Sequence, residues 1–225
     1  IGDWSSDVCS SDLLYSFFMH IPGLKVVAPS TPYDAKGCLL AAVRDDNPVI
    51  YVEHRTLHFH KGEVPEGDYT ISPGKARITA VGEAITLVGI SAMQLECLAA
   101  RELLWEKGVS AEVIDPIWLS PLDTQTIADS VRKTRKLLVV DNGWLCCGAS
   151  AEIVAQVVEQ VGGAVEVRRM GFAPVPCPTS PALEADFYPN CQTIAAQAYA
   201  LVRGEATWFP TPEADPHVPI FRGPF

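Results

Sequence analysis

The stretch of residues 136–161 limits the fold of this chain more than any other. It opens with residues 137–140, LLVV, an apolar run without alternating polar positions, which predicts a strand buried on both faces. Turn-forming residues follow at 141–143, DNG, and from Gly148 onward apolar side chains recur at helical spacing. A buried strand, a turn and an amphipathic helix in this order indicate one unit of a parallel sheet covered by helices.

The same succession of strand and helix returns on both sides of this stretch. Further strands are predicted at 77–79, 84–88, 111–115 and 164–168. A helix is predicted to begin at a capping box of Ser91 and Gln94, and the last helix at the N-cap Asn190. We therefore expect an α/β fold in which residues 75–204 form a three-layer domain with a mostly parallel sheet.

A shorter unit precedes this domain. Residues 24–27 and 49–52 are predicted strands joined by a helix. Thr31 is the predicted N-cap of that helix and Pro32 its first residue. Two strands and one helix bury too little apolar surface to be stable alone. We therefore expect residues 14–53 to be the end of a larger domain whose beginning lies outside this chain.

Three other segments have compositions of their own. Residues 1–13 contain the triplet Ser-Ser-Asp twice and resemble a translated sequencing adapter, so we expect a non-native tract; the alternative is a natural, disordered N terminus. Residues 54–74, rich in proline, glycine and charged residues, predict a linker. Residues 205–225 contain five prolines and little periodicity, which predicts a tail that wraps a neighbour or is mobile.

The composition argues against some classes of partner. The chain has a net charge of −10 and no basic stripe, which opposes binding to nucleic acid or anionic lipid. No apolar run approaches the roughly 20 residues that span a bilayer, so we expect no membrane segment. A folded protein or a small molecule is the expected partner.

The cysteines indicate a cytoplasmic protein. Seven are present, an odd number without a C-x-x-C pair, and several fall in predicted helices or beside predicted strands. Buried free thiols in a reducing cytoplasm explain this pattern better than disulfides or zinc ligands. The adjacent pair Cys146 and Cys147 has a second interpretation, a redox switch.

Two other groups of residues are candidate sites by their type and spacing. His54, His58 and His60 suit zinc if they share a helix, but their segment leaves a strand and enters the linker, which favours solvated or interface histidines. The turn at 141–143 and Gly148 meet a helix N terminus, the geometry that binds phosphate in doubly wound proteins. Because neither G-x-G-x-x-G nor a P-loop motif is present there, we expect these glycines to serve the turn and helix packing.

Four segments together resemble one enzyme family. They are HIPGLKVVAPSTPYDAKGCLLAAVRDDNPVIYVEH, PGKARI, KTRKLLVVDNGW and SAEI, and the similarity runs in register from residue 14 to residue 204. The sequence resembles the β subunit of thiamine-diphosphate-dependent 2-oxo acid dehydrogenases, the pyruvate, branched-chain and acetoin dehydrogenase group within the transketolase superfamily. The resemblance implies a C-terminal transketolase-like domain, preceded by the last crossover of a pyrimidine-binding domain, in an N-terminally truncated subunit.

The resemblance also implies an activity and its partners. In such enzymes thiamine diphosphate with magnesium decarboxylates a 2-oxo acid, and the acyl group passes to lipoyl groups. The implied partners are an α subunit and a second β subunit, in a heterotetramer, and a lipoyl acyltransferase core. The cofactor-activating glutamate and the histidine that assists acyl transfer would precede residue 14. We therefore expect the cofactor to be held mainly by the absent segment and the α subunit, and the fragment to be inactive alone.

A few site residues follow from the resemblance in the part that is present. Ala42, Asp45 and Asn47 fall on positions that bind a structural potassium ion in the family. Residues of these types are also common where a helix ends in a turn, which is the alternative interpretation. His20 matches a histidine near the subunit interface, where it has either a substrate-side catalytic role or a structural one.

Alternatives to this function stay open. One is a fragment of a single-chain relative such as transketolase or deoxyxylulose-phosphate synthase, and another is a non-catalytic assembly module built on the second domain. A natural module covers its apolar surface, so exposed apolar side chains on residues 24–52 would argue against the module. The family tends to have arginines where Ile117 and Ser120 stand, so some interface contacts are expected to differ here.

Overall fold

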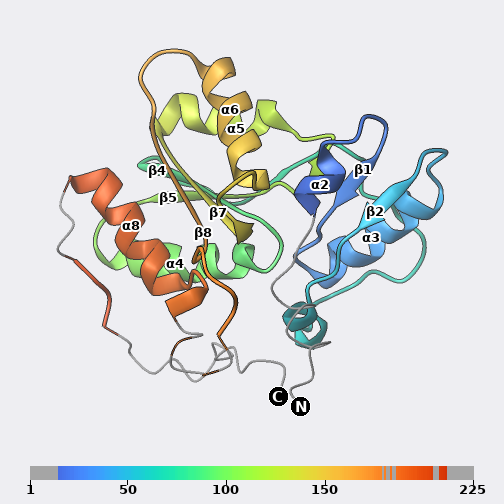
Figure 1. The fold of residues 1–225 in the computed structure, drawn as a ribbon, viewed down its shortest axis with the longest axis horizontal. Coiled ribbons are helices and arrows are strands. Elements are labelled where there is room, and N and C mark those ends of the chain that lie inside the picture. Colours follow the sequence, from blue (N-terminus) through green and yellow to red (C-terminus); the bar gives the residue numbers. More distant parts are fainter. Residues whose placement is uncertain (1–14, 179, 181–182, 184–185, 205–207, 212–225) are drawn as a thin grey trace.

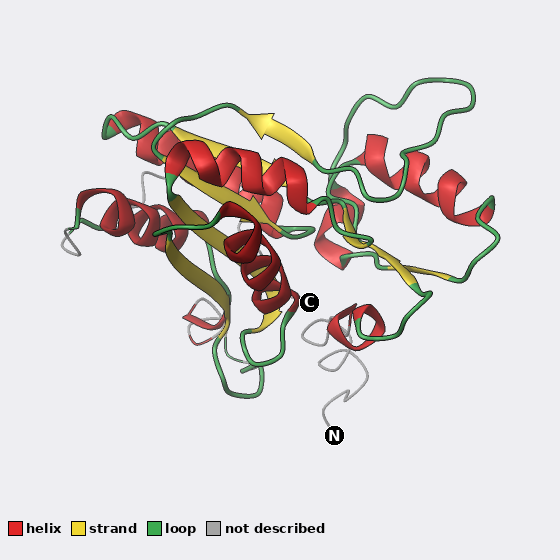
Figure 2. Ribbon diagram, turned by 90° about the horizontal axis from the view of Figure 1, so that it is seen from above, coloured by secondary structure: helices red, strands yellow, loops and turns green. Residues whose placement is uncertain are grey.

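The structure is a computed structural model that describes residues 15–178, 180, 183, 186–204 and 208–211. Two sheets lie side by side in it, a large one covered by helices and a small one with α3 against it (Figure 1). Figure 2 shows from above that helices lie on both sides of the large sheet. None of the described helices is long and apolar enough to span a membrane.

The large sheet has the strand order β3-β5-β4-β7-β8. Its strands, in chain order, are β3 (Arg77–Ala80), β4 (Ile85–Gly89), β5 (Ala111–Asp115), β7 (Lys136–Trp144) and β8 (Glu166–Phe172). β3 pairs antiparallel with β5, and the other neighbours pair parallel. The predicted α/β fold with a mostly parallel sheet is confirmed.

Four helices cover the two faces of this sheet. They are α4 (Met93–Glu106), α5 (Thr124–Thr134), α6 (Ala149–Val161) and α8 (Cys191–Arg203). Leu137 and Val139 of β7 belong to the core beneath α5 and α6, whereas Leu138 and Val140 belong to the core beneath α4 and α8. These four side chains are fully buried. A strand with apolar neighbours on both faces has no position for a polar residue, which explains the unbroken apolar run.

The small sheet joins the two parts of the chain. β1 (Lys25–Val27) and β2 (Val49–Tyr51) pair parallel and are connected by α3 (Pro32–Val43), the crossover that the sequence predicts. The third strand, β6 (Trp118–Ser120), pairs antiparallel with β1, although it comes from the chain between β5 and α5. The crossover therefore shares its sheet with a strand from the larger domain, a pairing that no local pattern indicated.

Two short helices flank the crossover. α2 (Tyr15–Met19) precedes β1, and the 3-10 helix η1 (Arg55–Phe59) follows β2. Part of the segment expected to be a linker is thus helical. Thr31 caps α3 as predicted, since its Oγ1 accepts the Asp34 N–H at 3.1 Å. Asn190 caps α8 in the same way, accepting the Thr193 N–H at 3.0 Å.

The predicted capping box at the start of α4 is wrong. Ser91 has φ 54°, and its hydroxyl has no hydrogen-bond partner in the described part of the chain. The Ser91 carbonyl accepts the Gln94 N–H at 3.0 Å instead. A backbone turn therefore starts this helix where a side-chain cap was expected.

The predicted end of the central strand is also wrong. β7 continues through the turn-forming residues 141–143 to Trp144, which pairs with Phe172 of β8. Gly171 of β8 permits this close approach, because a Cβ there would lie 2.4 Å from the Gly143 carbonyl oxygen. Close pairing of β7 with β8 at Gly171 thus overrides the local turn preference of residues 141–143.

Candidate functional site

A buried network of charged side chains lies where the crossover meets the larger domain. Asp34, in the first turn of α3, contacts the guanidinium of Arg77 at the start of β3. The same guanidinium lies 4.0 Å from the carboxylate of Asp115 at the end of β5. Ser30 donates its hydroxyl hydrogen to Asp115, and the Ile117 N–H donates to it at 2.9 Å. One arginine and one serine thus connect two carboxylates from different parts of the chain.

Burial shifts the pKa values of Asp115 and of the neighbouring Cys38. The side chains of Asp34 and Asp115 are fully buried, while that of Arg77 is 35% exposed. Burial raises the pKa of Asp115 to about 7, against the hydrogen bonds from Ser30 and Ile117. Burial also raises the pKa of the neighbouring Cys38 thiol to about 12, and the Asp34 carboxylate adds to the shift. The two carboxylates and the Cys38 thiol are closed off from solvent, so the network is suited to holding two parts of the chain together rather than to reacting with a substrate.

A second buried contact joins α2 to the end of β7. The Tyr15 hydroxyl donates to Asp141, and the Ser150 N–H donates to the other oxygen of this carboxylate at 2.9 Å. Burial raises the pKa of Asp141 against these hydrogen bonds. The N terminus of α6 thus already holds an anion of the protein itself, at the junction where a phosphate was considered. Gly148 serves close packing, since a Cβ there would lie 2.2 Å from the Trp144 carbonyl oxygen.

The structure brings Ala42, Asp45 and Asn47 together in the loop that ends α3. The Asp45 N–H donates to the Ala42 carbonyl at 3.3 Å. The Asp45 carboxylate contacts Lys25 Nζ and accepts the Asn47 N–H at 2.9 Å. The hydrogen bond from Lys25 is the main reason that the pKa of Asp45 is lowered. The carboxylate is thus already neutralised by Lys25, and the carbonyl oxygens of this loop, each with a second lone pair, are the groups that fit a potassium ion.

The predicted histidines occupy separate environments. His20 lies exposed just after α2. His54 is half-buried, with its Nδ1 2.6 Å from the Thr56 hydroxyl, and burial lowers its pKa to about 4. His58 is exposed on η1, 3.9 Å from Glu53. Among the described residues, no group of three or more histidine, cysteine, aspartate or glutamate side chains converges on a point that could hold a metal ion.

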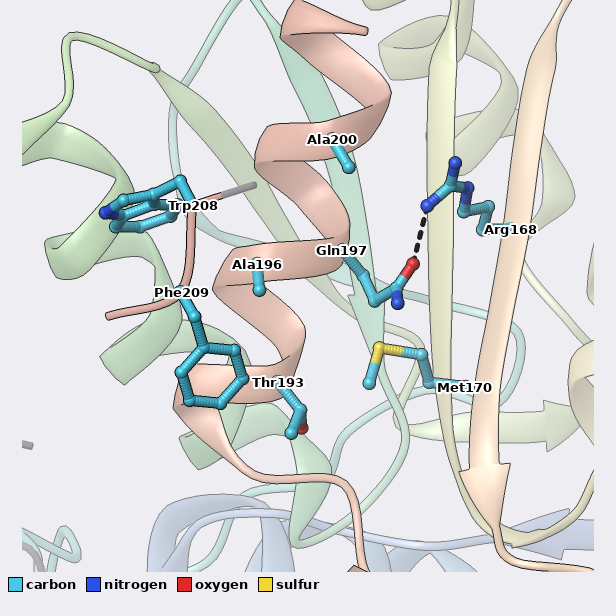
Figure 3. A pocket seen from close by; sticks show the side chains of 8 residues that line it. All are labelled: Arg168, Met170, Thr193, Ala196, Gln197, Ala200, Trp208 and Phe209. Atoms are coloured by element: carbon cyan, nitrogen blue, oxygen red, sulfur yellow. Dashed lines mark hydrogen bonds between the residues drawn. The ribbon is translucent and has the colours of Figure 1, made fainter. Parts of the chain in front are cut away.

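A small pocket that the sequence did not indicate lies beside the edge strand β8 (Figure 3). It has a volume of about 220 Å³ between β8, α8 and residues 208–209. Its lining residues are Arg168, Met170, Thr193, Ala196, Gln197, Ala200, Trp208 and Phe209. Arg168 Nη1 donates to Gln197 Oε1 at 2.6 Å, so the one cation of the pocket is already paired with an amide. The aromatic lining residues, Trp208 and Phe209, belong to the segment that was predicted as a tail, where the sequence has no periodicity that would indicate a pocket.

Apolar side chains are exposed on the crossover. Val43 and Leu39 of α3 are 76% and 49% exposed, and Phe59 of η1 is 86% exposed. β2 forms one edge of the small sheet, and among the described residues its outer side has no strand partner. Exposed apolar side chains beside an unpaired strand are typical of a surface that another chain covers.

Two family models match the chain. Residues 74–194 match the model described as the transketolase C-terminal domain, and residues 10–59 match the transketolase pyrimidine binding domain. The first match covers most of the large sheet and its helices, and the second covers the crossover.

Several curated proteins are similar in sequence. Acetoin:2,6-dichlorophenolindophenol oxidoreductase subunit beta of Cupriavidus necator is 43% identical over 196 residues, which cover 86% of this chain and 58% of the relative. The Bacillus subtilis protein of the same description is 40% identical over 194 residues, covering 85% of this chain and 57% of the relative. Pyruvate dehydrogenase E1 component subunit beta of Porphyra purpurea is 40% identical over 176 residues, covering 77% and 53%. The chain thus spans little more than half the length of these relatives.

A solved structure has the same fold. It is described as a split gene transketolase, inactive beta4 tetramer, and superposes with a TM-score of 0.70 at 22% sequence identity. The superposition covers 84% of this chain and 61% of that chain. At this identity the likeness shows the fold alone.

Proposed function

Because this chain belongs to the transketolase family, whose C-terminal domain model matches residues 74–194, we propose that it acts as part of the β subunit of a thiamine-diphosphate-dependent 2-oxo acid dehydrogenase. The reaction is oxidative decarboxylation of a 2-oxo acid with transfer of the acyl group to a lipoyl group. The observation that carries the proposal is the 43% identity over 196 residues to an acetoin oxidoreductase β subunit, a match longer than either family model covers. A transketolase has weaker support, since the structure described as a split gene transketolase shares only 22% identity with this chain.

The residues of this chain would contribute to catalysis by holding the segments around the cofactor in place. Thiamine diphosphate, when bound with magnesium, supplies the nucleophilic carbon that attacks the 2-oxo group and releases carbon dioxide. The described residues offer no cluster suited to magnesium, so we propose that the metal and the diphosphate are held by the α subunit and by β-subunit sequence outside this chain. The network of Asp34, Arg77 and Asp115 then fixes the crossover against the larger domain. When a cofactor is bound between two subunits, the protein segments on both sides of it must be held in place, because small displacements of the reacting groups lower the reaction rate.

The proposed partners are an α subunit, a second β subunit and a lipoyl acyltransferase core. The exposed Val43, Leu39 and Phe59 beside the unpaired edge of β2 support a protein partner at the crossover. They also count against a free-standing assembly module, which would cover this surface. We place the complex in the cytoplasm, because Cys38, Cys97, Cys146 and Cys147 are free thiols, as expected in a reducing compartment.

A chimeric β subunit tests this function. Residues 15–225 of this chain are joined to the preceding part of the Cupriavidus necator β subunit and co-expressed with the α subunit of that organism. We expect turnover of one substrate among pyruvate, branched-chain 2-oxo acids and acetoin, and no turnover without thiamine diphosphate. An assembled complex that is inactive on all of them, beside an active natural complex, would refute the proposal.

The same assay tests the proposed substrate-side role of His20. His20→Asn should lower kcat by on the order of 100-fold if the imidazole transfers a proton. His58→Asn, an exposed histidine on η1, is the matched control and should leave kcat unchanged. A His20→Asn complex with normal kcat and normal assembly would leave His20 without a catalytic role.

We also propose that the loop of Ala42, Asp45 and Asn47 binds potassium. At a potassium concentration about 100-fold above Kd, binding to the folded state alone adds about 2.7 kcal/mol, so Tm should be higher in potassium chloride than in sodium chloride of equal ionic strength. Asp45→Ala removes the acceptor of the Asn47 N–H that shapes the loop and should abolish this difference. The control is Asp46→Ala, at the exposed neighbouring residue, which should retain the difference in Tm between the two salts. Equal Tm of the unaltered chain in both salts would contradict the site.

A further inference from the structure

We infer that Cys146 and Cys147 form a chelating site for a soft, thiophilic cation that takes few ligands, Cu(I) being the best match. Both side chains are exposed on the loop between β7 and α6. Their Sγ atoms lie 4.0 Å apart. The site is independent of the proposed dehydrogenase function, because neither cysteine takes part in the two buried contacts between the crossover and the larger domain.

The distance between the sulfurs suits chelation better than a disulfide. Two thiolates bound to one cation at about 2.3 Å stand about 3.8 Å apart at a near-tetrahedral S–metal–S angle and about 4.6 Å apart at the linear angle that a two-coordinate Cu(I) ion prefers. The observed sulfur–sulfur distance of 4.0 Å lies between these two separations. A disulfide needs about 2.05 Å between the sulfurs and a Cα separation of about 4.4 Å or more, whereas adjacent residues are only about 3.8 Å apart. A direct bond between Cys146 and Cys147 would therefore be strained.

The loop that carries the two cysteines is held at both ends. Arg169 Nη1 donates to the Leu145 carbonyl at 2.8 Å, directly before the pair. Trp144 Nε1 donates to the Ala173 carbonyl at 3.2 Å. After the pair, the Ser150 N–H donates to the buried Asp141 at 2.9 Å. Two thiols presented by a fixed loop lose little freedom when they bind one ion, which favours chelation.

The ligand set limits the cation. Thiolate sulfur selects soft ions such as Cu(I) and zinc over magnesium or calcium. Structural zinc takes about four protein ligands, and the described residues offer no cluster of three or more metal-binding side chains. Cu(I) accepts two thiolates. Each thiol loses one proton as its sulfur–copper bond forms, so that two protons are released and no electron is transferred.

Copper competition with the full 225-residue chain tests the site. The chain is titrated with Cu(I) under anaerobic conditions against bathocuproine disulfonate, and the copper bound per chain is measured. We expect one high-affinity equivalent. Cys146→Ser and Cys147→Ser should each weaken this affinity by about 100-fold or more, because the second sulfur binds as part of the same loop.

Matched variants and a mass measurement complete the test. Cys177→Ser removes a partly buried thiol elsewhere and should retain the high-affinity equivalent, as should Cys9→Ser. Circular dichroism checks that every variant is folded. The inference is overturned if both loop variants bind copper as tightly as the unaltered chain. It is equally overturned if intact mass shows that the thiols oxidise to each other, with the loss of two hydrogens, and the chain then takes no copper after reduction.

Discussion

Replacing Arg77 with methionine is expected to lower the free energy of unfolding by about 3 kcal/mol, because removing one partner of a buried ion pair leaves the other charge without compensation. Asp34 is fully buried and contacts this guanidinium. Its remaining hydrogen bond comes from the Thr31 hydroxyl, and its Oδ1 has no partner in the described part of the chain. Urea unfolding of the folded variant measures the loss.

A surface arginine supplies the matched control for this prediction. Arg44 contacts Asp68, and both side chains are more than half exposed. Arg44→Met should therefore change the free energy of unfolding by less than about 1 kcal/mol. Adding Asp34→Asn to Arg77→Met removes the unpaired charge and should recover part of the lost stability. Equal losses for Arg77→Met and Arg44→Met would show that the buried network contributes no more than a surface pair.

The local sequence pattern predicts those helices and strands whose signal lies within a few consecutive residues. The LLVV run predicted a strand buried on both faces, and its side chains alternate between two cores. The caps at Thr31 and Asn190 were also predictable, because the acceptor and the N–H group lie three residues apart. An apolar run and an N-cap each involve only a few neighbouring residues, so a single sequence is enough to predict the strand or the helix start.

The contacts that join the two sheets were not predictable in this way. Arg77 and Asp34 are 43 residues apart, and Tyr15 and Asp141 are 126 residues apart. β6 pairs with β1 across the domain boundary, although residues 118–120 show no strand pattern of their own. Periodicity reports which side of an element is buried but not what it is buried against. The potassium loop and His20 came from resemblance alone, and both stay predictions.

The pH dependence of stability should change when Asp115 is replaced with asparagine. Burial raises the pKa of this carboxyl to about 7 from an ordinary value of 3.8, so the folded state keeps a proton that the unfolded state has lost. Its contribution to stability is fully present below about pH 4 and is lost as the pH rises through about 7. Because one pKa unit corresponds to about 1.4 kcal/mol, a pKa raised from 3.8 to about 7 gives a loss on the order of 4 kcal/mol.

Comparing Asp115→Asn with the unaltered chain separates the effect of Asp115 from that of the other titratable groups. Asparagine stays neutral and can still accept the Ile117 N–H, so Asp115→Asn should gain stability relative to the unaltered chain as the pH rises from 4 to 8. The charged neighbours Asp34 and Arg77 are unchanged in both proteins, and so is His54, whose lowered pKa acts in the opposite sense below pH 6.5. Asp46→Asn, at an exposed site, should run parallel to the unaltered chain. A constant difference between Asp115→Asn and the unaltered chain across this range would mean that Asp115 is already ionised at pH 5 and that Arg77 compensates both carboxylates.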